Sequence, residues 1–322
     1  MKTTISAAAL AASLIASLTY SQAGMAQITA TLTQTGTNNS AGIEQETTRR
    51  SRAVITQTGN GNIAGGATGE GGIVQRISGG TATIAQDGSR NVAGVLQERA
   101  TIRATATIGQ TGSDNLVMVS QVRNFLPDLY ALQQGVRNAT YVKQTGVDNA
   151  ADTRQTGVDN TITLDQNGAA YGGPLITQDG TGNTAGLTQS SDTFTGGVSL
   201  SQTGMLNNAT ATRTGSVFGN GLSIVQNGTG NQATHTSNGS RNASLITQNG
   251  DANTATVTKS LSYSASTVLQ TGNRNTATVV QSGTTGAGSQ ADNFATITQV
   301  GNGFVASIVQ AGRSNVGTIH QH

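Results

Sequence analysis

The sequence predicts an all-β protein: a β-solenoid of about twelve strand–turn–strand coils, with two facing parallel sheets, that follows a cleaved signal peptide. Three observations predict this class. A frame built from Gln, Gly, Asn, Ala and an aliphatic residue recurs along the chain at a nearly fixed period. Apolar and polar residues alternate within the frame, as in strands. The composition, with 43 Gly, two Pro and 3% aromatic residues, is too poor in large apolar side chains for an ordinary globular core.

The repeat is clearest between Gln248 and Lys259, which reads Q-x-G-x-x-N-x-A-x-V-x-K. With the first Gln as position 0, Gly follows at +2, Asn at +5, Ala at +7, an aliphatic residue at +9 and usually Gln at +11. Most successive units are 22–24 residues apart, and two are 29 apart. A period of this length is typical of stacked repeats. Position 0 falls at Gln34, Gln57, Gln86, Gln110, Gln133, Gln155, Gln178, Gln202, Gln226, Gln248, Gln270 and Gln299.

The frame places its amide side chains on one face of each strand. Positions +5, +7, +9 and +11 share parity, so their side chains point the same way. A single coil cannot bury this face, but stacked coils can. Stacking at ~4.8 Å sets Gln over Gln and Asn over Asn, which permits structural ladders of side-chain amides. The +5 residues are Asn39, Asn62, Asn91, Asn115, Asn138, Asn160, Asn183, Asn207, Asn231, Asn253 and Asn275, and Phe304 replaces Asn in the last unit.

The +2 glycines indicate a tight turn between the two strands of each coil, because glycine readily adopts a positive φ. All twelve units have it. These predicted turn residues are Gly36, Gly59, Gly88, Gly112, Gly135, Gly157, Gly180, Gly204, Gly228, Gly250, Gly272 and Gly301. Enrichment in Gln, Gly and Asn is also typical of disordered low-complexity tracts. A disordered tract has no reason to keep aliphatic residues at fixed positions, so we favour the solenoid.

The first residues read as a secretory signal peptide. Lys2 precedes an apolar run from Ala7 to Leu18, and small residues near Ala26 suit cleavage after that position. The run is too short for a transmembrane helix, so we expect no transmembrane segment. The predicted organisation is therefore a signal peptide at 1–26 and a repeat solenoid at 27–322. Two insertions, at residues 65–72 and 284–289, are expected to form loops.

Units eight to ten depart from the frame. Arg213, Ser237 and Lys259 replace the +11 Gln in succession. The same units carry pairs of threonines expected to point outward: Thr210 and Thr212, Thr234 and Thr236, Thr256 and Thr258. The alternative function is therefore a monomeric β-solenoid that binds ice or polysaccharide through a threonine face. Threonine is also a common outward residue of strands.

Catalytic and metal-binding patterns are weak in this sequence. Of its three histidines, His235 falls at an inward position and is expected to fill space, while His320 and His322 lack a third metal ligand. A carbohydrate-active enzyme would need converging acids, and Asp148, Asp152, Asp159 and Asp165 lie mostly near turns without such spacing. We therefore expect no enzyme, no metal and no cofactor. The net charge of +2 also gives no reason to expect a nucleic-acid partner.

The ends of the repeat array suggest a function. The frame begins soon after the predicted cleavage point and continues to Gln321, which leaves no obvious segment to cover the terminal coils. Uncovered sheet edges pair with other chains, and matching ends that do not close into a ring produce a filament. An exported solenoid with two such ends is expected to act as a fibre subunit.

The pattern resembles the curlin repeat of curli subunits, which form bacterial extracellular amyloid fibres. The resemblance rests on residues such as Gln86, Gly88, Asn91, Ala93 and Gln97, and it extends over roughly residues 30–321. It implies a secreted subunit that polymerises at the cell surface, for adhesion and biofilm matrix, with the help of a nucleating subunit and an outer-membrane secretion channel. The chain has more units than familiar curli subunits and essentially lacks their Gly-rich N-terminal targeting segment.

Overall fold

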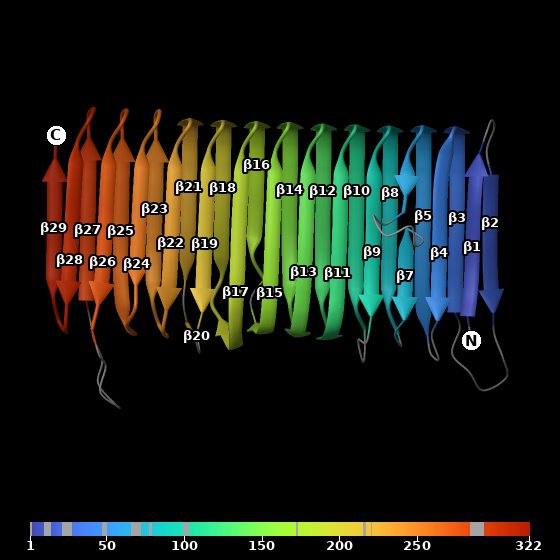
Figure 1. Cartoon of the computed structure of the whole chain (residues 1–322), viewed down its shortest axis with the longest axis horizontal. Helices are drawn as coiled ribbons and strands as arrows, with labels where there is room; N and C mark the ends of the chain where they lie inside the picture. The colour runs from blue at the N-terminus through green and yellow to red at the C-terminus, as the bar shows by residue number, and fades with distance from the viewer. Residues whose placement is uncertain are drawn as a thin grey trace. The chain divides into compact units, whose positions relative to one another are not determined.

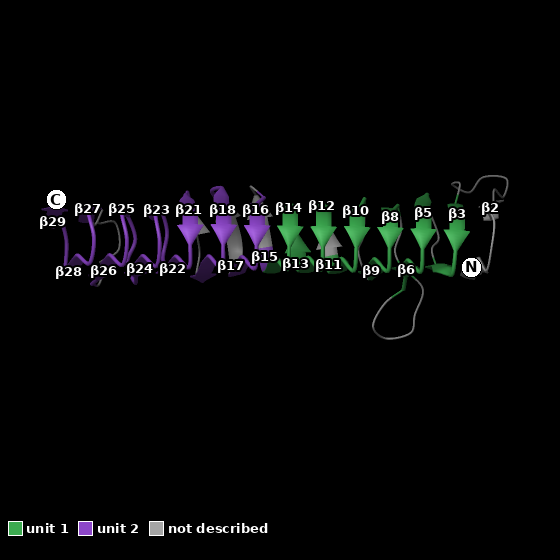
Figure 2. Cartoon of the chain, turned by 90° about the horizontal axis from the view of Figure 1, so that it is seen from above, with its two compact units in different colours: residues 1–165 green, residues 166–322 purple. Residues whose placement is uncertain are grey.

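The computed structural model describes residues 2–9, 14–20, 28–46, 50–65, 72–76, 79–98, 103–171, 173–214, 217–219, 221–283 and 293–322. The predicted cleavage point and most of both predicted insertions lie outside the described residues. The chain divides into two compact units, residues 1–165 and 166–322, which are coloured separately in Figure 2. Strand β15 (Thr161–Tyr171) contains the boundary between them.

Unit 1 contains two mainly parallel sheets, seen as two layers in Figure 2. Sheet B1 holds the position-0 Gln residues, and sheet A1 holds the second strand of each coil. Sheet B1 comprises β3 (Ile28–Thr37), β5 (Ser51–Asn60), β8 (Thr81–Ser89), β10 (Thr105–Ser113), β12 (Asp128–Val136) and β14 (Ala150–Val158). Sheet A1 comprises β4 (Asn39–Glu46), β6 (Ile63–Ala64), β7 (Ile73–Arg76), β9 (Val92–Glu98), β11 (Leu116–Phe125) and β13 (Ala139–Val147).

Unit 2 repeats this arrangement (Figure 1). Sheet B2 comprises β16 (Leu175–Thr181), β18 (Val198–Met205), β21 (Leu222–Thr229), β23 (Ala243–Asn249), β25 (Ser264–Thr271), β27 (Asn293–Val300) and β29 (Val316–Gln321). Sheet A2 comprises β17 (Thr184–Thr195), β19 (Asn208–Thr214), β22 (Gln232–Asn238), β24 (Thr254–Lys259), β26 (Thr276–Ser282) and β28 (Val305–Ala311), and the short β20 (Val217–Phe218) pairs with the end of β17.

The alternating pattern of each strand produces a thin core between the two sheets of a unit. In β10, Ala106, Ile108 and Gln110 are buried, whereas the residues between them are half-buried and face outward. The facing strand β11 contributes the buried Val117 and Val119. Small aliphatic side chains and buried amides thus replace the large apolar residues of a globular core. The predicted fold class, an all-β solenoid with parallel sheets, is confirmed.

Equivalent positions of successive coils stand directly opposite each other. Ile84 pairs with Ile108, and Gln86 with Gln110 and then Gln133. A slip of one residue would turn the buried set toward solvent, so burial of this face fixes the register. The insertion in the second coil preserves the register: β6 pairs with the start of β9, and β7 returns with Gln75 opposite Gln97.

The N-terminal end differs from the expectation of an uncovered coil. β1 (Lys2–Ala9) pairs with β4, and β2 (Leu14–Tyr20) pairs with β3, both antiparallel. While residues 2–20 are attached, the first coil therefore has a neighbour on this side. These covering strands lie within the predicted signal peptide, which the sequence analysis treated as absent from the folded protein. Among the described residues, there is no helix long and apolar enough to span a membrane.

Candidate functional site: stacked amides and the last coil

The position-0 glutamines form a continuous hydrogen-bonded ladder within each unit, and every one of them is at most 2% exposed. Between successive coils of one unit, the side chain donates from Nε2 to Oε1 of the next Gln, over 2.7–2.9 Å. Gln110 illustrates how the second amide hydrogen is used: Nε2 also donates to Val92 O, across the core, over 3.1 Å. The ladder therefore joins neighbouring coils and both sheets. It runs from Gln34 to Gln155 in unit 1 and from Gln178 to Gln321 in unit 2.

The +11 glutamines form a second ladder on the opposite sheet. In unit 1 it runs through Gln45, Gln75, Gln97, Gln121 and Gln144 over 2.7–2.9 Å. In unit 2 it joins Gln166 to Gln189 and Gln281 to Gln310, and the rungs between these pairs contain no Gln. The interruption coincides with Arg213, Ser237 and Lys259.

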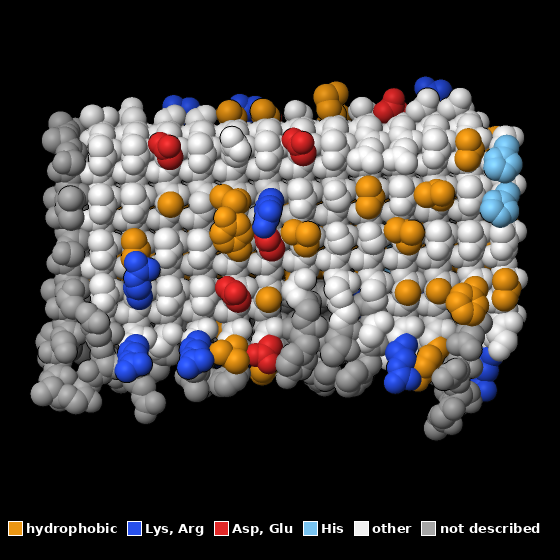
Figure 3. Space-filling view, turned by 180° about the vertical axis from the view of Figure 1, so that it is seen from behind, with side chains coloured by type: hydrophobic (Ala, Val, Ile, Leu, Met, Phe, Trp, Pro, Cys, Tyr) orange, Lys and Arg blue, Asp and Glu red, His pale blue; other side chains and the backbone are white. Residues whose placement is uncertain are grey.

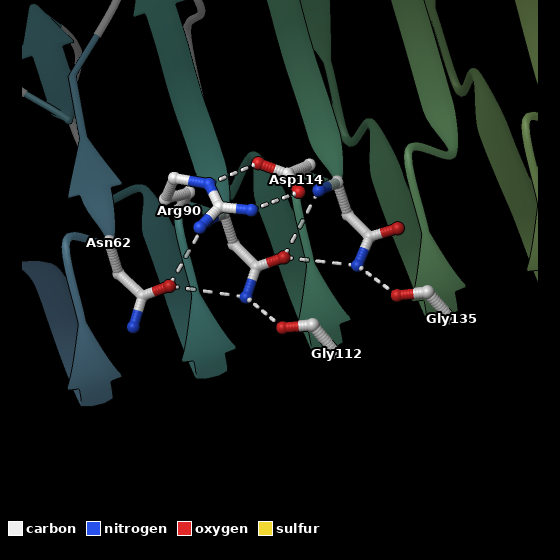
Figure 4. Close-up of polar contacts among 7 residues, drawn as sticks. Asn62, Arg90, Gly112, Asp114 and Gly135 are labelled. Atoms are coloured by element: carbon white, nitrogen blue, oxygen red, sulfur yellow. Dashed lines mark hydrogen bonds and ion pairs between the residues drawn. The ribbon is translucent and has the colours of Figure 1, made fainter.

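The +5 asparagines tie each turn to the next (Figure 4). Oδ1 of Asn91 accepts both the backbone N–H and the side-chain Nδ2–H of Asn115, at 3.1 and 3.0 Å, and Nδ2 of Asn91 donates to Gly112 O at 3.0 Å. The same pattern recurs in unit 2, for example between Asn207 and Asn231. The eleven predicted Asn residues are each at most 1% exposed. At Phe304 the backbone N–H still donates to Asn275 Oδ1, but no side-chain amide follows.

The +2 glycines occupy a conformation and a space that other residues cannot. All twelve have φ between 107° and 134°. A Cβ on Gly88 would lie 2.0 Å from the carbonyl oxygen of Gly112 in the next coil. That carbonyl is the acceptor for Asn91, so the close approach of the backbones and the Asn ladder belong to one arrangement.

The +4 residues were missed by the sequence analysis. All twelve have φ between 54° and 73°, although their identities range from Gly and Asn to Arg, Asp, Ala and Leu. In unit 1 they bring Arg90 to Asp114, and Arg137 to Asp159, each with a closest N–O distance of 2.7 Å. The Arg90 guanidinium lowers the pKa of Asp114, chiefly through their hydrogen bonds, and Arg137 acts likewise on Asp159. Because the repeat period places the +4 residues of neighbouring coils side by side, the sequence could have revealed these ion pairs.

The remaining charged side chains of the described residues are dispersed over the strands and turns. On the face in Figure 3, Lys, Arg, Asp and Glu side chains are scattered among uncharged ones. The described residues contain no group of three potential metal ligands. His320 and His322 stack with their ring centroids 6.3 Å apart. His235 is buried, at the inward position given by its parity.

The last coil has unshared edges in the described structure. Thr276 donates its N–H to Phe304 O, and Ser282 O accepts from Gly312 N, so even-numbered residues of β28 face β26. By the alternation of a parallel ladder, the N–H and C=O of Val305 and Val309 face away from β26. The side chains of Val305, Val309 and Val316 are 70%, 71% and 76% exposed. Apolar strands at a sheet edge are suited to pairing with another chain.

The two ladders end in different groups: Gln321 on β29 presents a donor at the end of the position-0 ladder, and Gln45 on β4 presents an acceptor at the start of the +11 ladder. At the last coil, Gln321 Nε2 donates one hydrogen to Val305 O. Its second hydrogen is equivalent to the one that Gln299 donates to Gln321 in the coil that follows. At the first coil, Oε1 of Gln45 is buried and receives no hydrogen bond from the described residues. Later residues of its ladder, such as Gln75, accept at this atom from the preceding coil.

Comparison with known families gives one match: residues 28–59, which form the first coil and the following strand, match the curlin associated repeat. The resemblance inferred from the sequence is confirmed for this segment. No curated protein matches the chain. Because the later coils place the same Gln, Gly and Asn residues in register with those of the first, they extend the same structural unit.

Proposed function

We propose that this chain, which carries the curlin associated repeat at residues 28–59, is a secreted structural subunit that self-assembles head-to-tail into extracellular curli-like amyloid fibres. The fibres would serve surface adhesion and biofilm matrix at the bacterial cell surface. The role is structural rather than enzymatic and uses no cofactor. A nucleating subunit and an outer-membrane secretion channel are the proposed partners, and nucleic acid is not. These partners rest on the repeat family rather than on any surface of the chain.

The observation that supports assembly most strongly is that both ends present sheet edges and hydrogen-bonding groups to which a further coil could pair. Gln45 Oε1 is a buried acceptor without a donor among the described residues, and a buried acceptor left unpaired costs about 1–3 kcal/mol. The final coil exposes Val305, Val309 and Val316, and the backbone N–H groups of Val305 and Val309 face away from β26. A second copy stacked in the register of the internal coils would cover these valines and continue both ladders. Removal of residues 1–26 is part of this proposal, because β1 and β2 occupy the edge of the first coil.

The test is assembly of residues 27–322. We expect the purified chain to form fibres that bind an amyloid dye and give a cross-β reflection at about 4.7–4.8 Å. The dye signal should show a lag, which preformed fibres of the same chain shorten. A chain that stays monomeric for days at tens of micromolar would contradict the proposal.

A second candidate function has one specific observation in its favour. The predicted threonine face exists as in-register rows: Thr210 pairs with Thr234 and then Thr256, and Thr212 with Thr236 and then Thr258. Flat, regularly spaced hydroxyls suit ice or polysaccharide. Thr234→Tyr and Thr256→Tyr would abolish such binding and leave the fold intact. Loss of binding to ice or to a polysaccharide, with fibre assembly unchanged, would favour this second function.

A further inference from the structure

Unit 2 buries three basic side chains in adjacent coils. Arg213 and Lys259 are 1% exposed and His235 is 3% exposed. Arg213 on β19 stands opposite Ser237 on β22, which stands opposite Lys259 on β24, so these residues interrupt one ladder position. His235 is on the middle strand, two residues before Ser237 and also facing inward. We call Arg213, His235 and Lys259 the basic cluster.

Lys259 and His235 have no buried acidic side chain near them among the described residues. No Asp or Glu is buried among the described residues. The buried residues of the facing strands β21, β23 and β25 have aliphatic, hydroxyl or amide side chains, none of which titrates in the ordinary pH range. They are Leu222, Ile224, Gln226, Ser244, Ile246, Gln248, Ser264, Ser266, Val268 and Gln270. Among the described buried residues of these strands, the titratable groups are therefore the members of the cluster.

Neutral polar groups hold the cluster instead. Lys259 Nζ donates to the carbonyl oxygens of Ala243 and Ser264. His235 Nε2 lies 2.9 Å from Ser244 Oγ, while its Nδ1 is buried without a hydrogen-bond partner among the described residues. Such contacts replace only part of the hydration of a charged group, and burial therefore favours the neutral forms of the lysine and histidine.

We propose that β19, β22 and β24 form a segment of unit 2 whose local stability depends on protonation: the strands open in acid and close as the pH rises. The coils with uninterrupted Gln ladders respond to pH far less, because a neutral amide does not titrate. The inference concerns the stability of unit 2 and does not depend on the proposed fibre.

The direction follows from proton binding. Burial, followed by the charges of Lys259 and Arg213, lowers the pKa of His235 from 6.5 to about 3. Burial lowers the pKa of Lys259 from 10.5 to about 7. Between each pair of values the open state binds a proton that the closed state does not, so closing is favoured as the pH rises. The windows run from about pH 3 to 6.5 for His235 and from about pH 7 to 10.5 for Lys259.

The test is amide hydrogen exchange of the full chain, read by mass spectrometry at pH 5, 7 and 9 and corrected for the intrinsic exchange rate. The opening constant of peptides from β22 and β24 should fall with pH, by up to about tenfold per pH unit within each window. Peptides from β10 and β12, whose ladders are intact, should show no comparable change. Equal pH profiles for the two sets of peptides would overturn the proposal.

Ladder repair gives the matched variants. Arg213→Gln, Ser237→Gln and Lys259→Gln together restore the +11 Gln, and His235→Val restores the residue type of Val257 and Val279, which follow in register. The repaired chain should lose the pH response and gain protection at pH 7. Arg313→Gln, which changes an exposed cation, should leave the response unchanged.

Single variants keep the proposal testable if the repaired chain does not fold. Lys259→Gln should remove only the change between pH 7 and 9, and His235→Val only the change below pH 7. A repaired or single variant that folds and keeps the full wild-type pH response would overturn the proposal.

Discussion

At the scale of the residue, asparagine at +5 does work that few side chains can do. Asn115 accepts two hydrogen bonds from Asn138, at 3.1 and 3.2 Å, and donates to Asn91 Oδ1 and to Gly135 O. A short amide carries both donor and acceptor, and here one end of it reaches each neighbouring turn. The role depends on burial, since water would otherwise satisfy the same groups.

We expect Asn115→Ala to destabilise unit 1 by about 3 kcal/mol, because it leaves buried groups of Asn138 and Gly135 without their partners. Chemical unfolding followed by circular dichroism would measure the change. Asn60→Ala is the matched control: Asn60 is exposed and its side chain accepts one bond from Thr37, so a change below about 0.5 kcal/mol is expected. Equal losses in both variants would show that the ladder adds no particular stability.

The sequence predicts the inward residues well because strand parity alone decides which side chains face the core. The spacing of Gln110 and Asn115 in the repeat was enough to predict that their side chains are buried. Parity also predicts that Lys259 is buried, but it does not reveal which groups accept hydrogen bonds from its ammonium. The acceptors are the carbonyl oxygens of Ala243 and Ser264, which belong to the facing sheet. The positive φ at +4 could not be read from composition, because Leu206 and Ala252 adopt it as Gly61 does.

At the scale of the element, the proposed assembly depends on the edges of the last coil. The odd-numbered backbone groups of β28 are unused by β26, so a residue without an N–H there costs the folded chain no hydrogen bond. The same residue would remove a donor that an incoming strand requires.

Val309→Pro is therefore expected to leave the fold of residues 27–322 intact and to slow fibre growth at least tenfold. Seeded growth measured with an amyloid dye tests the rate, and circular dichroism of the soluble chain tests the fold. Val309→Thr is the control, because threonine keeps both the N–H and the strand preference. Growth of the proline variant at the rate of the threonine variant would exclude β28 as a growing edge.

At the scale of the whole molecule, the predicted signal peptide has a structural counterpart that the sequence analysis did not anticipate. Its two segments pair antiparallel with β4 and β3, in contrast to the parallel internal coils. The predicted signal peptide rests on Lys2 and the apolar run that follows it, and such a segment carries no pattern that specifies where it pairs while still attached. Within each unit, by contrast, the stacking followed from the repeat period.

A chain that retains residues 1–26 is expected to cap fibres at one end. Added at one part in ten to residues 27–322, it should shorten the fibres seen by electron microscopy. A chain retaining the leader with Ile5→Pro and Ala16→Pro, which disrupts both covering strands, serves as the control and should shorten them less. Fibres of unchanged length with the intact leader would mean that β1 and β2 do not block addition.

The Gln ladders have a common sense of donation, from each coil to the one that follows it in the sequence, in unit 1 and again in unit 2. Each side-chain amide has a dipole, and dipoles aligned in a row add, as peptide dipoles do along a helix. In a dry interior such alignment polarises neighbouring bonds and strengthens them. A row of this kind has a partly positive pole and a partly negative pole. Two subunits that met with like poles together would repel each other. In the proposed fibre, electrostatics as well as shape would therefore select the orientation of each added subunit.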